Sequence, residues 1–239
     1  MRALLAAILL WATPALAVEC RDITFDGASY TICEVDPATE DLRLFHEDAN
    51  GEVIGSFGGI ADQPGVGSLV FAMNAGMYHD DRSPVGHYVE NGVETMRVIP
   101  NAGPGNFGLL PNGVFCITDD HARVIETLRY LDEAPACRDA TQSGPMLVID
   151  GKLHPRFLPG SSSRLIRNGV GTNAEGTRVV FAIANDPVNF HAFGRLFRDE
   201  LGLPQALFFD GKVSRLYARD LGRSDFGFQL GPMVAVVEP

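Results

Sequence analysis

Short apolar runs separated by turn signals dominate this chain, and they predict strands far more often than helices. Three runs near the N-terminal end alternate with polar residues, at 23–25 (ITF), 30–35 (YTICEV) and 42–46 (LRLFH). Asp-Gly and Asp-Pro turns separate them, as in antiparallel strands joined by tight turns. Later runs are continuously apolar, which is typical of strands buried on both faces. These later runs are 69–73 (LVFAM), 178–184 (RVVFAIA), 207–209 (LFF) and 233–237 (MVAVV).

One segment has the apolar period of a helix, at 189–202 (NFHAFGRLFRDELG). Its large apolar residues recur at i, i+3, i+4 and i+8 from Phe193, which places them on one face. Asn189 can cap the start, and Gly202 can end the helix. Strand, helix and strand in this order predict a crossover connection, which leaves Asp186 and Asp210 at one edge of a sheet.

The predicted fold class is α+β, with a mixed, mostly antiparallel sheet core, few helices and one β-α-β crossover near the C-terminus. The sequence has no Ser/Gly linker, charge block or repeat. A single domain over 18–239 is therefore expected, since about 220 residues suffice for one core.

The first residues have the pattern of a secretory signal peptide over 1–17. Arg2 precedes the apolar run 3–11, and the small residues Ala15 and Ala17 flank Leu16 as in a cleavage site. An uncleaved anchor is the alternative, but the run is short for a bilayer and ends near Pro14. We expect cleavage after Ala17 and a periplasmic or secreted protein without a membrane span.

Export changes the interpretation of the cysteines, because disulfides persist in oxidising compartments. The four cysteines allow three pairings. Cys20 and Cys33 flank a predicted hairpin with an Asp-Gly turn, so Cys20–Cys33 and Cys116–Cys137 are the favoured pairs. Without a CxxC pair, a zinc ribbon or a thioredoxin-like redox site is not expected.

The formal charge of −11 becomes −12 when Arg2 leaves with the signal peptide. This acidity argues against nucleic acid or an anionic membrane surface as the main partner. It also makes a local cluster of arginines more informative. Nothing in the sequence determines the oligomeric state.

The stretch 141–171 contains such a cluster. It begins with Thr141–Gly144, expected to be a small polar loop, and passes through the apolar run 146–149 to a turn at Asp150-Gly151. Arg164 and Arg167 follow a segment rich in Pro, Gly and Ser. Polar groups at strand ends and two cations suit a pocket for an anionic substrate, and a solvated hairpin explains the same pattern.

Other polar residues also stand at the ends of apolar runs. Asn74, Ser143, Asp186 and Asp210 are the main examples, and Asn106 lies in a turn-rich segment. Carboxylates and arginines together suit hydrolysis of a substrate whose leaving group is negatively charged. The alternative is that they are ordinary turns and surface charges. No HExxH or DxDxDG pattern occurs, so no cofactor is predicted, although a divalent metal stays open.

Several ordered blocks resemble the phosphodiester glycosidase family, which includes the lysosomal "uncovering" enzyme and many exported bacterial proteins. The blocks are NAGMY, SPVG, GNFGLLPNGVF, TQSGPMLVIDGKLHP, SRLIRNGVG and ALFFDGKVSRLY. They extend over roughly 69–237, most of the mature chain.

The resemblance implies site residues at matching positions. These are Asn74 and Gly76, Pro84 and Gly86, Ser143, Gly144 and Pro145, Arg164, Arg167 and Gly169, and Asp210 with Ser214. The family's acidic block usually has the form Leu-Asp-Gly-Gly-Gly-Ser. Here Lys212 and Val213 replace two of its glycines, which affects how closely a ligand can approach the backbone.

The resulting prediction is an exported hydrolase that cleaves a sugar–phosphate diester or a related glycan linkage. Asp210 would be the essential carboxylate, with Asp186 or His154 assisting proton transfer. Arg164 and Arg167 would bind phosphate. The remaining substrate-binding residues would be Asn74, Gly76, Asn106, Ser143, Gly144 and Ser214. A non-catalytic periplasmic protein that binds a glycan or sugar phosphate is the alternative, and a serine hydrolase using Ser143 is a more distant one.

Overall fold

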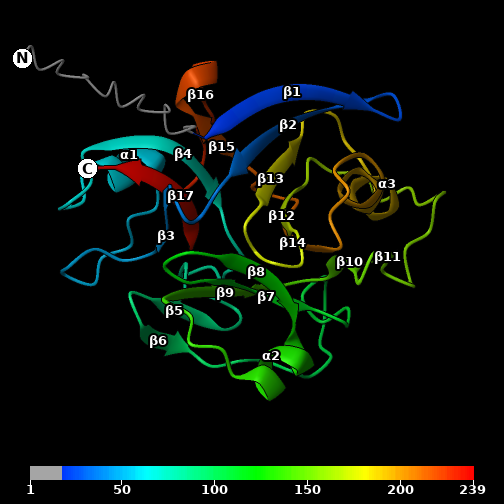
Figure 1. Cartoon of the computed structure of the whole chain (residues 1–239), viewed down its shortest axis with the longest axis horizontal. Coiled ribbons are helices and arrows are strands. Elements are labelled where there is room, and N and C mark those ends of the chain that lie inside the picture. The colour runs from blue at the N-terminus through cyan, green and yellow to red at the C-terminus, as the bar shows by residue number, and fades with distance from the viewer. Residues whose placement is uncertain (1–17) are drawn as a thin grey trace, which may run out of the picture.

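Three antiparallel sheets form the body of the protein (Figure 1). The computed structural model describes residues 18–239, and the predicted signal peptide at 1–17 lies outside the described residues. The first sheet has the order β1 (Glu19–Phe25), β2 (Ala28–Val35), β13 (Val179–Ala184), β12 (Asn168–Thr172), β14 (Gln205–Asp210), β10 (Met146–Ile149) and β11 (Lys152–Leu153).

The second and third sheets have five strands each. The second has the order β16 (Arg223–Ser224), β15 (Leu216–Ala218), β4 (Ser68–Asn74), β17 (Met233–Glu238) and β3 (Asp41–Phe45). The third has the order β6 (Val93–Met96), β5 (Tyr88–Glu90), β9 (Asp139–Ser143), β7 (Gly113–Ile117) and β8 (Ala122–Glu126). The helices are short, namely α1 (Phe57–Ala61), α2 (Thr127–Glu133), α3 (Phe190–Arg195), the π-helical turn Leu196–Glu200 and the 3-10 turn Arg219–Leu221. The predicted α+β class is confirmed.

Phenylalanine rings from all three sheets meet in the centre of the molecule. Phe181 of β13 packs against Phe71 of β4 and Phe115 of β7, with ring centroids 4.8 and 5.8 Å apart. All three side chains are fully buried. Burying a phenylalanine stabilises a fold by about 1.5–3 kcal/mol, so this cluster holds the sheets together.

The hairpin β1–β2 forms as the sequence predicts. Asp26 and Gly27 both have positive φ, at 49° and 75°, which is the geometry of a two-residue hairpin turn. This register places Cys20 directly opposite Cys33. The two predicted disulfides, Cys20–Cys33 and Cys116–Cys137, are both present.

The crossover near the C-terminus is also present. Asn189 caps α3 by accepting a hydrogen bond from the Ala192 N–H at 2.9 Å, and α3 packs its buried Phe193 on the first sheet. Strand β12 lies between β13 and β14 and pairs antiparallel with both. The two outer strands are therefore parallel to each other, and both carboxyl ends reach the same edge of the sheet.

Thr141–Gly144 is not the small polar loop that the sequence suggested. Residues 141–143 belong to the fully buried strand β9. Their polar groups are satisfied inside the protein, since Gln142 Oε1 accepts from the N–H groups of His87 and Ile99 at 3.0 and 2.9 Å. Composition alone misses this strand, because buried hydrogen bonds replace the expected contact with water.

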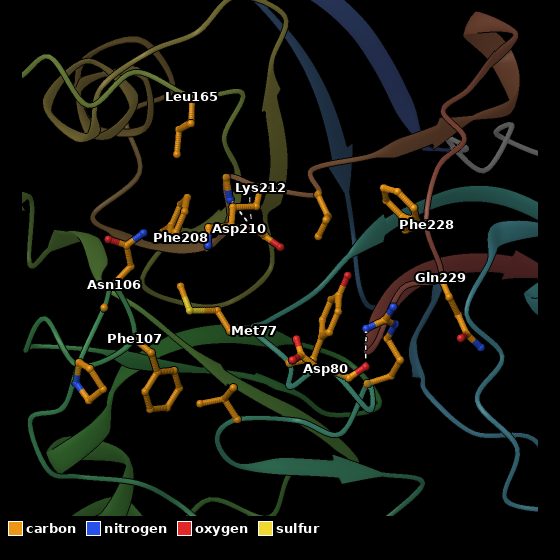
Figure 2. Close-up of a pocket in the computed structure, with 17 residues that line it drawn as sticks. Met77, Asp80, Asn106, Phe107, Leu165, Phe208, Asp210, Lys212, Phe228 and Gln229 are labelled. Atoms are coloured by element: carbon orange, nitrogen blue, oxygen red, sulfur yellow. Dashed lines mark hydrogen bonds between the residues drawn. The ribbon is translucent and has the colours of Figure 1, made fainter.

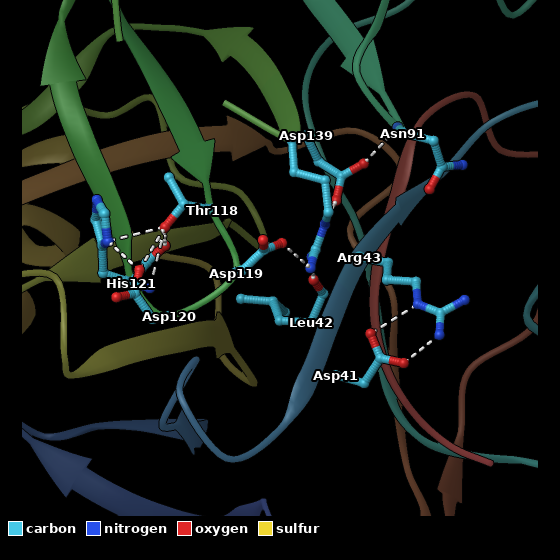
Figure 3. A network of polar contacts seen from close by, with 10 residues as sticks. Asp41, Leu42, Arg43, Asn91, Thr118, Asp119, Asp120, His121 and Asp139 are labelled. Atoms are coloured by element: carbon cyan, nitrogen blue, oxygen red, sulfur yellow. Dashed lines mark hydrogen bonds and ion pairs between the residues drawn. The ribbon is translucent and has the colours of Figure 1, made fainter. Parts of the chain in front are cut away.

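A buried carboxylate in the same strand ties the third sheet to the second (Figure 3). The Asp139 side chain is fully buried, accepts from the Asn91 N–H at 2.9 Å and pairs with Arg138 at 2.9 Å. Arg138 also donates to the Leu42 carbonyl of β3. Burial raises the pKa of Asp139, and the Asn91 N–H and Arg138 oppose this rise.

Within residues 18–239, no helix has both the length and the apolar character needed to cross a bilayer.

Candidate active site

A cleft of about 630 Å³ opens where loops from the three sheets converge (Figure 2). Its walls come from the loop after β4, from the segment at 104–107, from Leu165 ahead of β12, from the end of β14 and from the loop before β17. Polar lining residues are Tyr78, Asp80, Arg82, Asn106, Asp210, Lys212 and Gln229. Apolar side chains occupy much of the rest, which is typical of small-molecule sites.

Asp210 brings a carboxylate into this cleft at the end of β14. Its Oδ1 accepts hydrogen bonds from the backbone N–H groups of Gly211 and of Lys212, the latter at 2.7 Å. Both bonds use Oδ1, so Oδ2 is the oxygen left for a substrate. Burial raises the pKa of Asp210, and the backbone N–H groups and the Lys212 charge oppose this rise. The carboxylate is thus partly desolvated but has no arginine partner within residues 18–239, which favours a reactive over a structural role.

A chain of buried polar groups fixes the backbone around Asp210. Asn168, opposite Asp210 in the β12–β14 pair, donates to Asn74 Oδ1 at 3.1 Å. Asn74 Oδ1 also accepts from the Arg215 N–H at 2.9 Å. The Ser214 hydroxyl lies within 3.2 Å of Asn168 Oδ1 and 3.1 Å of the Asp210 carbonyl. Asn74 and Ser214 therefore lie behind the cleft wall and hydrogen-bond to the residues that form it.

Within residues 18–239, Arg167 is a buried cation without a carboxylate partner. Its side chain is fully buried, and its guanidinium lies 3.7 Å from the centroid of the Phe190 ring. Nε donates to the Val188 carbonyl at 2.9 Å and Nη2 to the Ser163 carbonyl at 3.0 Å, whereas Nη1 finds no acceptor in the described part of the chain. Burial lowers the pKa of Arg167 to about 10, so it stays charged at neutral pH.

The free Nη1 atom points to a place for an anion. It lies 3.5 Å from the position of a Cβ on Gly211, and Gly211 lines the cleft. A buried charge is costly unless an opposite charge compensates it. Arg167 is therefore placed to attract a negatively charged group at the Gly211 wall.

Arg164 differs from Arg167 in its surroundings. Its side chain is exposed and its Nε donates to the Pro187 carbonyl at 3.1 Å. Leu165 lines the cleft, whereas Arg164 is not among the lining residues.

The two residues that replace the family's glycines fit the loop without strain. Neither Lys212 nor Val213 has a positive φ, so the backbone there does not require glycine. Both side chains line the cleft. The departure from the family pattern therefore places one charged and one apolar side chain at the cleft wall.

The Ser-Gly-Pro block packs beneath the site. Ser143 is fully buried and its hydroxyl donates to the Phe209 carbonyl at 3.2 Å. Gly144 has no room for a side chain, because a Cβ would lie 2.7 Å from Cβ of Asn112. Gly76 has a φ of +94° and a Cβ there would lie 2.6 Å from Thr141 Oγ1. These residues shape the wall by close packing.

The other predicted residues are divided between the cleft and distant positions. Asn106 lines the cleft. Asp186 reaches the same sheet edge as Asp210 but is exposed and accepts from the Ser29 N–H at 2.8 Å. His154 is buried elsewhere, with Nε2 3.0 Å from the Leu110 carbonyl and Nδ1 accepting from the Arg156 N–H at 3.2 Å. Burial lowers its pKa, which favours the neutral ring.

Sequence reasoning missed several cleft residues. Tyr78, Asp80 and Arg82 follow Asn74 in the same loop, and the Arg82 guanidinium lies 5.5 Å from the centre of the Tyr78 ring. Tyr78 belongs to the NAGMY block itself, which was the available signal. Phe228 and Gln229 come from a segment with no distinguishing pattern and could be found only from the fold. No group of three or more potential metal ligands occurs in the part of the chain that the structure describes.

Known proteins resemble this chain in sequence or in fold. The family model "Phosphodiester glycosidase" matches residues 67–227. The uncharacterized protein YigE of Escherichia coli (strain K12) is 34% identical over 221 residues, covering 91% of this chain and 85% of YigE.

Two solved structures have the same fold at low sequence identity. One is the catalytic domain of zebrafish N-acetylglucosamine-1-phosphodiester alpha-N-acetylglucosaminidase, auto-inhibited by its pro-peptide. It has a TM-score of 0.59 and 14% identity, over 93% of this chain and 83% of that one. The other is a hypothetical protein from Synechocystis, with a TM-score of 0.61 and 13% identity, over 94% of this chain and 64% of that one.

The chain has the fold of the zebrafish catalytic domain, and its cleft contains a strand-end carboxylate. The chain belongs to the phosphodiester glycosidase family.

Proposed function

We propose that this protein is an exported phosphodiester glycosidase, which hydrolyses the bond between the anomeric carbon of a sugar and a phosphodiester oxygen. One observation carries the proposal most directly. The carboxylate of Asp210 enters the cleft beside Gly211, and the unpartnered Nη1 of the buried Arg167 lies behind that same glycine. A carboxylate and a fixed cation at one wall suit attack at a sugar carbon next to a phosphate.

In this reaction the anomeric C–O bond breaks and its electron pair leaves with the phosphate. Water supplies the hydroxyl group that ends on the sugar carbon. Asp210 acts there as nucleophile or as general base, through the oxygen that the loop leaves open. Because a phosphomonoester is a weak base, its departure needs less help from a general acid than the departure of an alcohol.

The phosphate is stabilised by the cations at the Asp210 wall. Lys212 lines the cleft, and Arg167 adds its charge from behind Gly211. Asn106 orients the sugar by hydrogen bonding. Asn74, Ser143, Gly76, Gly144 and Ser214 hold the wall in shape. Arg164, Asp186 and His154 lie outside the cleft lining, so we expect them to make no contact with substrate.

Hydrolysis of sugar 1-phosphodiesters tests this function. The purified mature protein should release free sugar from at least one member of a panel that varies the sugar. Asp210→Asn should reduce kcat by about a thousandfold or more with the fold intact, and Asp186→Asn, the matched control at the same sheet edge, should change it less than threefold. Normal turnover by Asp210→Asn would remove this carboxylate from the mechanism.

Export is part of the proposal. Two disulfides support it, since such bonds are rare in reducing compartments. Mass spectrometry of the mature protein from its native host should find an N-terminus at Val18. A protein recovered from the cytoplasm with its N-terminus still at Met1 would contradict export.

A binding protein without catalysis is the second candidate. The observation that favours it is the Lys212 and Val213 pair, whose side chains occupy cleft space that glycines would leave free. Calorimetric binding of a sugar 1-phosphodiester that stays uncleaved on long incubation would choose this alternative.

A further inference from the structure

Two phenylalanines on the loop before β17 are exposed to solvent. Phe226 is 96% exposed and Phe228 is 84% exposed, more than any other large hydrophobic residue in the described chain. Such exposure is unfavourable for a phenyl ring, and exposed aromatic groups frequently mark binding sites. Only Phe228 of the two lines the cleft.

Hydrogen bonds hold this loop in place on both sides of Phe228. The buried Arg215 donates through Nη2 to the Phe228 carbonyl, and Gly227 packs against the same guanidinium. The Leu216 N–H donates to Asp225 Oδ2 at 3.0 Å, and the Leu230 N–H donates to the Gly55 carbonyl at 2.8 Å. The backbone that carries Phe228 is therefore anchored, so the ring is presented to solvent at a defined position.

The position of Phe228 divides the cleft into two sides. Figure 2 shows Phe228 and Gln229 on one side of Asp210, and Asn106, Phe107 and Phe208 on the other. A linkage cleaved at Asp210 has a group on each side of the broken bond. Each side of the cleft therefore has its own part of the substrate to bind.

The groups beside Phe228 suit a sugar ring. A pyranose has apolar C–H faces and hydroxyl groups around its edge, so it binds best to an aromatic face with hydrogen-bonding neighbours. Gln229, the residue after Phe228, also lines the cleft with an amide. Its Nε2 lies 3.4 Å from the Val53 carbonyl, which leaves Oε1 to accept from a hydroxyl.

A lipid surface fits this loop less well. Contact with anionic membranes depends on clustered lysines and arginines. The loop instead starts at Asp225, and the whole chain has a formal charge of −11. A carbohydrate is the occupant that the local chemistry favours.

We propose that Phe228 is the stacking platform of a second subsite, which binds a sugar ring. This subsite and Phe107 lie on opposite sides of the cleaved linkage. This inference rests on the proposed function, because Asp210 marks the point of cleavage. Phe228 thereby becomes a specificity-determining residue. It selects substrates that carry a ring beyond the phosphate over those with a small alkyl group there.

Two substrates with the same cleaved sugar test whether Phe228 selects for a ring beyond the phosphate. One is a sugar 1-phosphodiester with a second hexose as the other alcohol, and its partner has a methyl group instead. Phe228→Ala should lower kcat/KM for the hexose diester about tenfold, mainly through KM, and change the methyl diester less than twofold. Phe228→Tyr should retain wild-type values, because the aromatic face remains.

Phe226→Ala provides the matched control, since it removes an equally exposed ring from the same loop outside the cleft. It should leave both substrates within twofold of wild type. Equal losses on both substrates for Phe228→Ala, or no loss on either, would overturn the subsite while leaving the proposed hydrolase standing. Absence of turnover by the wild-type protein on every diester would overturn the proposed function and this inference with it.

Sedimentation with phosphatidylethanolamine–phosphatidylglycerol vesicles tests the lipid alternative. Wild-type protein should stay in the supernatant. Vesicle binding that Phe228→Ala and Phe226→Ala both abolish, without a change in diester turnover, would make the loop a membrane contact and overturn the proposal.

Discussion

The Nη1 atom of Arg167 lies 3.5 Å from the Cβ position of Gly211, a residue that lines the cleft. This relationship joins a buried charge to the residue that follows Asp210. The cation is held by two backbone carbonyls, at Val188 and Ser163. It is thus rigid before any substrate arrives, and a rigid charge stabilises an anionic leaving group without a reorganisation cost.

Replacing Arg167 should reduce activity much more than replacing Arg164, the other arginine of the SRLIR block. Arg167→Met should lower kcat/KM by about ten- to a hundredfold, since a charge-assisted hydrogen bond contributes about 1.5–3 kcal/mol. Arg164→Met should change it less than threefold because Arg164 is exposed and faces Pro187. Arg167→Lys should not restore activity, since a single ammonium cannot make the same fork of bonds. Steady-state kinetics check this, and equal losses at both positions would contradict it.

The acid limb of the pH–activity profile should report Asp210. Burial raises the pKa of Asp210, so activity that needs the carboxylate should fall as pH drops, with a midpoint above the usual aspartate value of 3.8. The Lys212 charge opposes this rise. Lys212→Met should therefore move the midpoint further up, as measured by kcat across pH 3–8. A midpoint that moves down in this variant would show that another group controls the limb.

Ser143 should resist labelling by a fluorophosphonate probe. Its hydroxyl is fully buried and donates to the Phe209 carbonyl, so it is neither accessible nor aligned with a base. Intact-mass measurement should show no adduct on the folded protein, and Ser143→Ala should keep at least a third of wild-type kcat. Stoichiometric labelling at Ser143 would instead support the serine hydrolase alternative.

The buried carboxyls of Glu40 and Glu90 should stabilise the fold less as pH rises toward neutrality. Burial raises the pKa of Glu90 from 4.5 to about 7, and it raises that of Glu40 likewise. Between pH 4.5 and 7 the folded protein keeps protons on these two carboxyls that the unfolded chain releases, so their contribution to the free energy of unfolding decreases with pH over this range. Asp199, whose arginine partners lower its pKa to about 2, contributes only below this window.

Thermal unfolding from pH 4.5 to 7.5 checks this, with Glu90→Gln as the variant. The amide still accepts the Tyr88 hydroxyl bond, so the fold should hold while the pH slope becomes shallower. Exposed Glu133→Gln is the control and should leave the slope unchanged. An unaltered slope in Glu90→Gln would assign the effect elsewhere.

Arg138 should matter for stability far more than surface arginines. Arg138→Ala would leave Asp139 buried without its ion-pair partner, which typically destabilises by about 3–5 kcal/mol. Arg129→Ala breaks the exposed pair with Asp150 and should cost about 1 kcal/mol or less. Urea unfolding of both variants gives the comparison, and similar values for the two would contradict a special role for Arg138.

Local patterns in the sequence predicted those features that local forces determine. The hairpin with its Cys20–Cys33 bridge follows from an Asp-Gly turn between alternating runs. The Asn189 cap and the crossover follow from helical periodicity between buried strands. In each case the residues that decide the structure are neighbours in the chain.

Structural features that depend on contacts between distant segments could not be predicted from local sequence patterns. Residues 141–143 looked like a loop because their polarity is satisfied only by segments such as the one at Ile99. Arg164 and Arg167 looked equivalent, and only the fold shows that Arg167 is buried and Arg164 exposed. Phe228 enters the cleft because β17 pairs with β4, a contact between segments far apart in the chain.

The meeting of three sheets at Phe181 has a consequence for how such proteins diversify. The cleft walls are loops borne by different sheets, whereas the aromatic cluster that joins the sheets lies beneath them. One loop can therefore be rebuilt during evolution without disturbing the other walls or the core. Solved structures at 13–14% identity share this fold, so the arrangement of the sheets persists while most of the sequence differs.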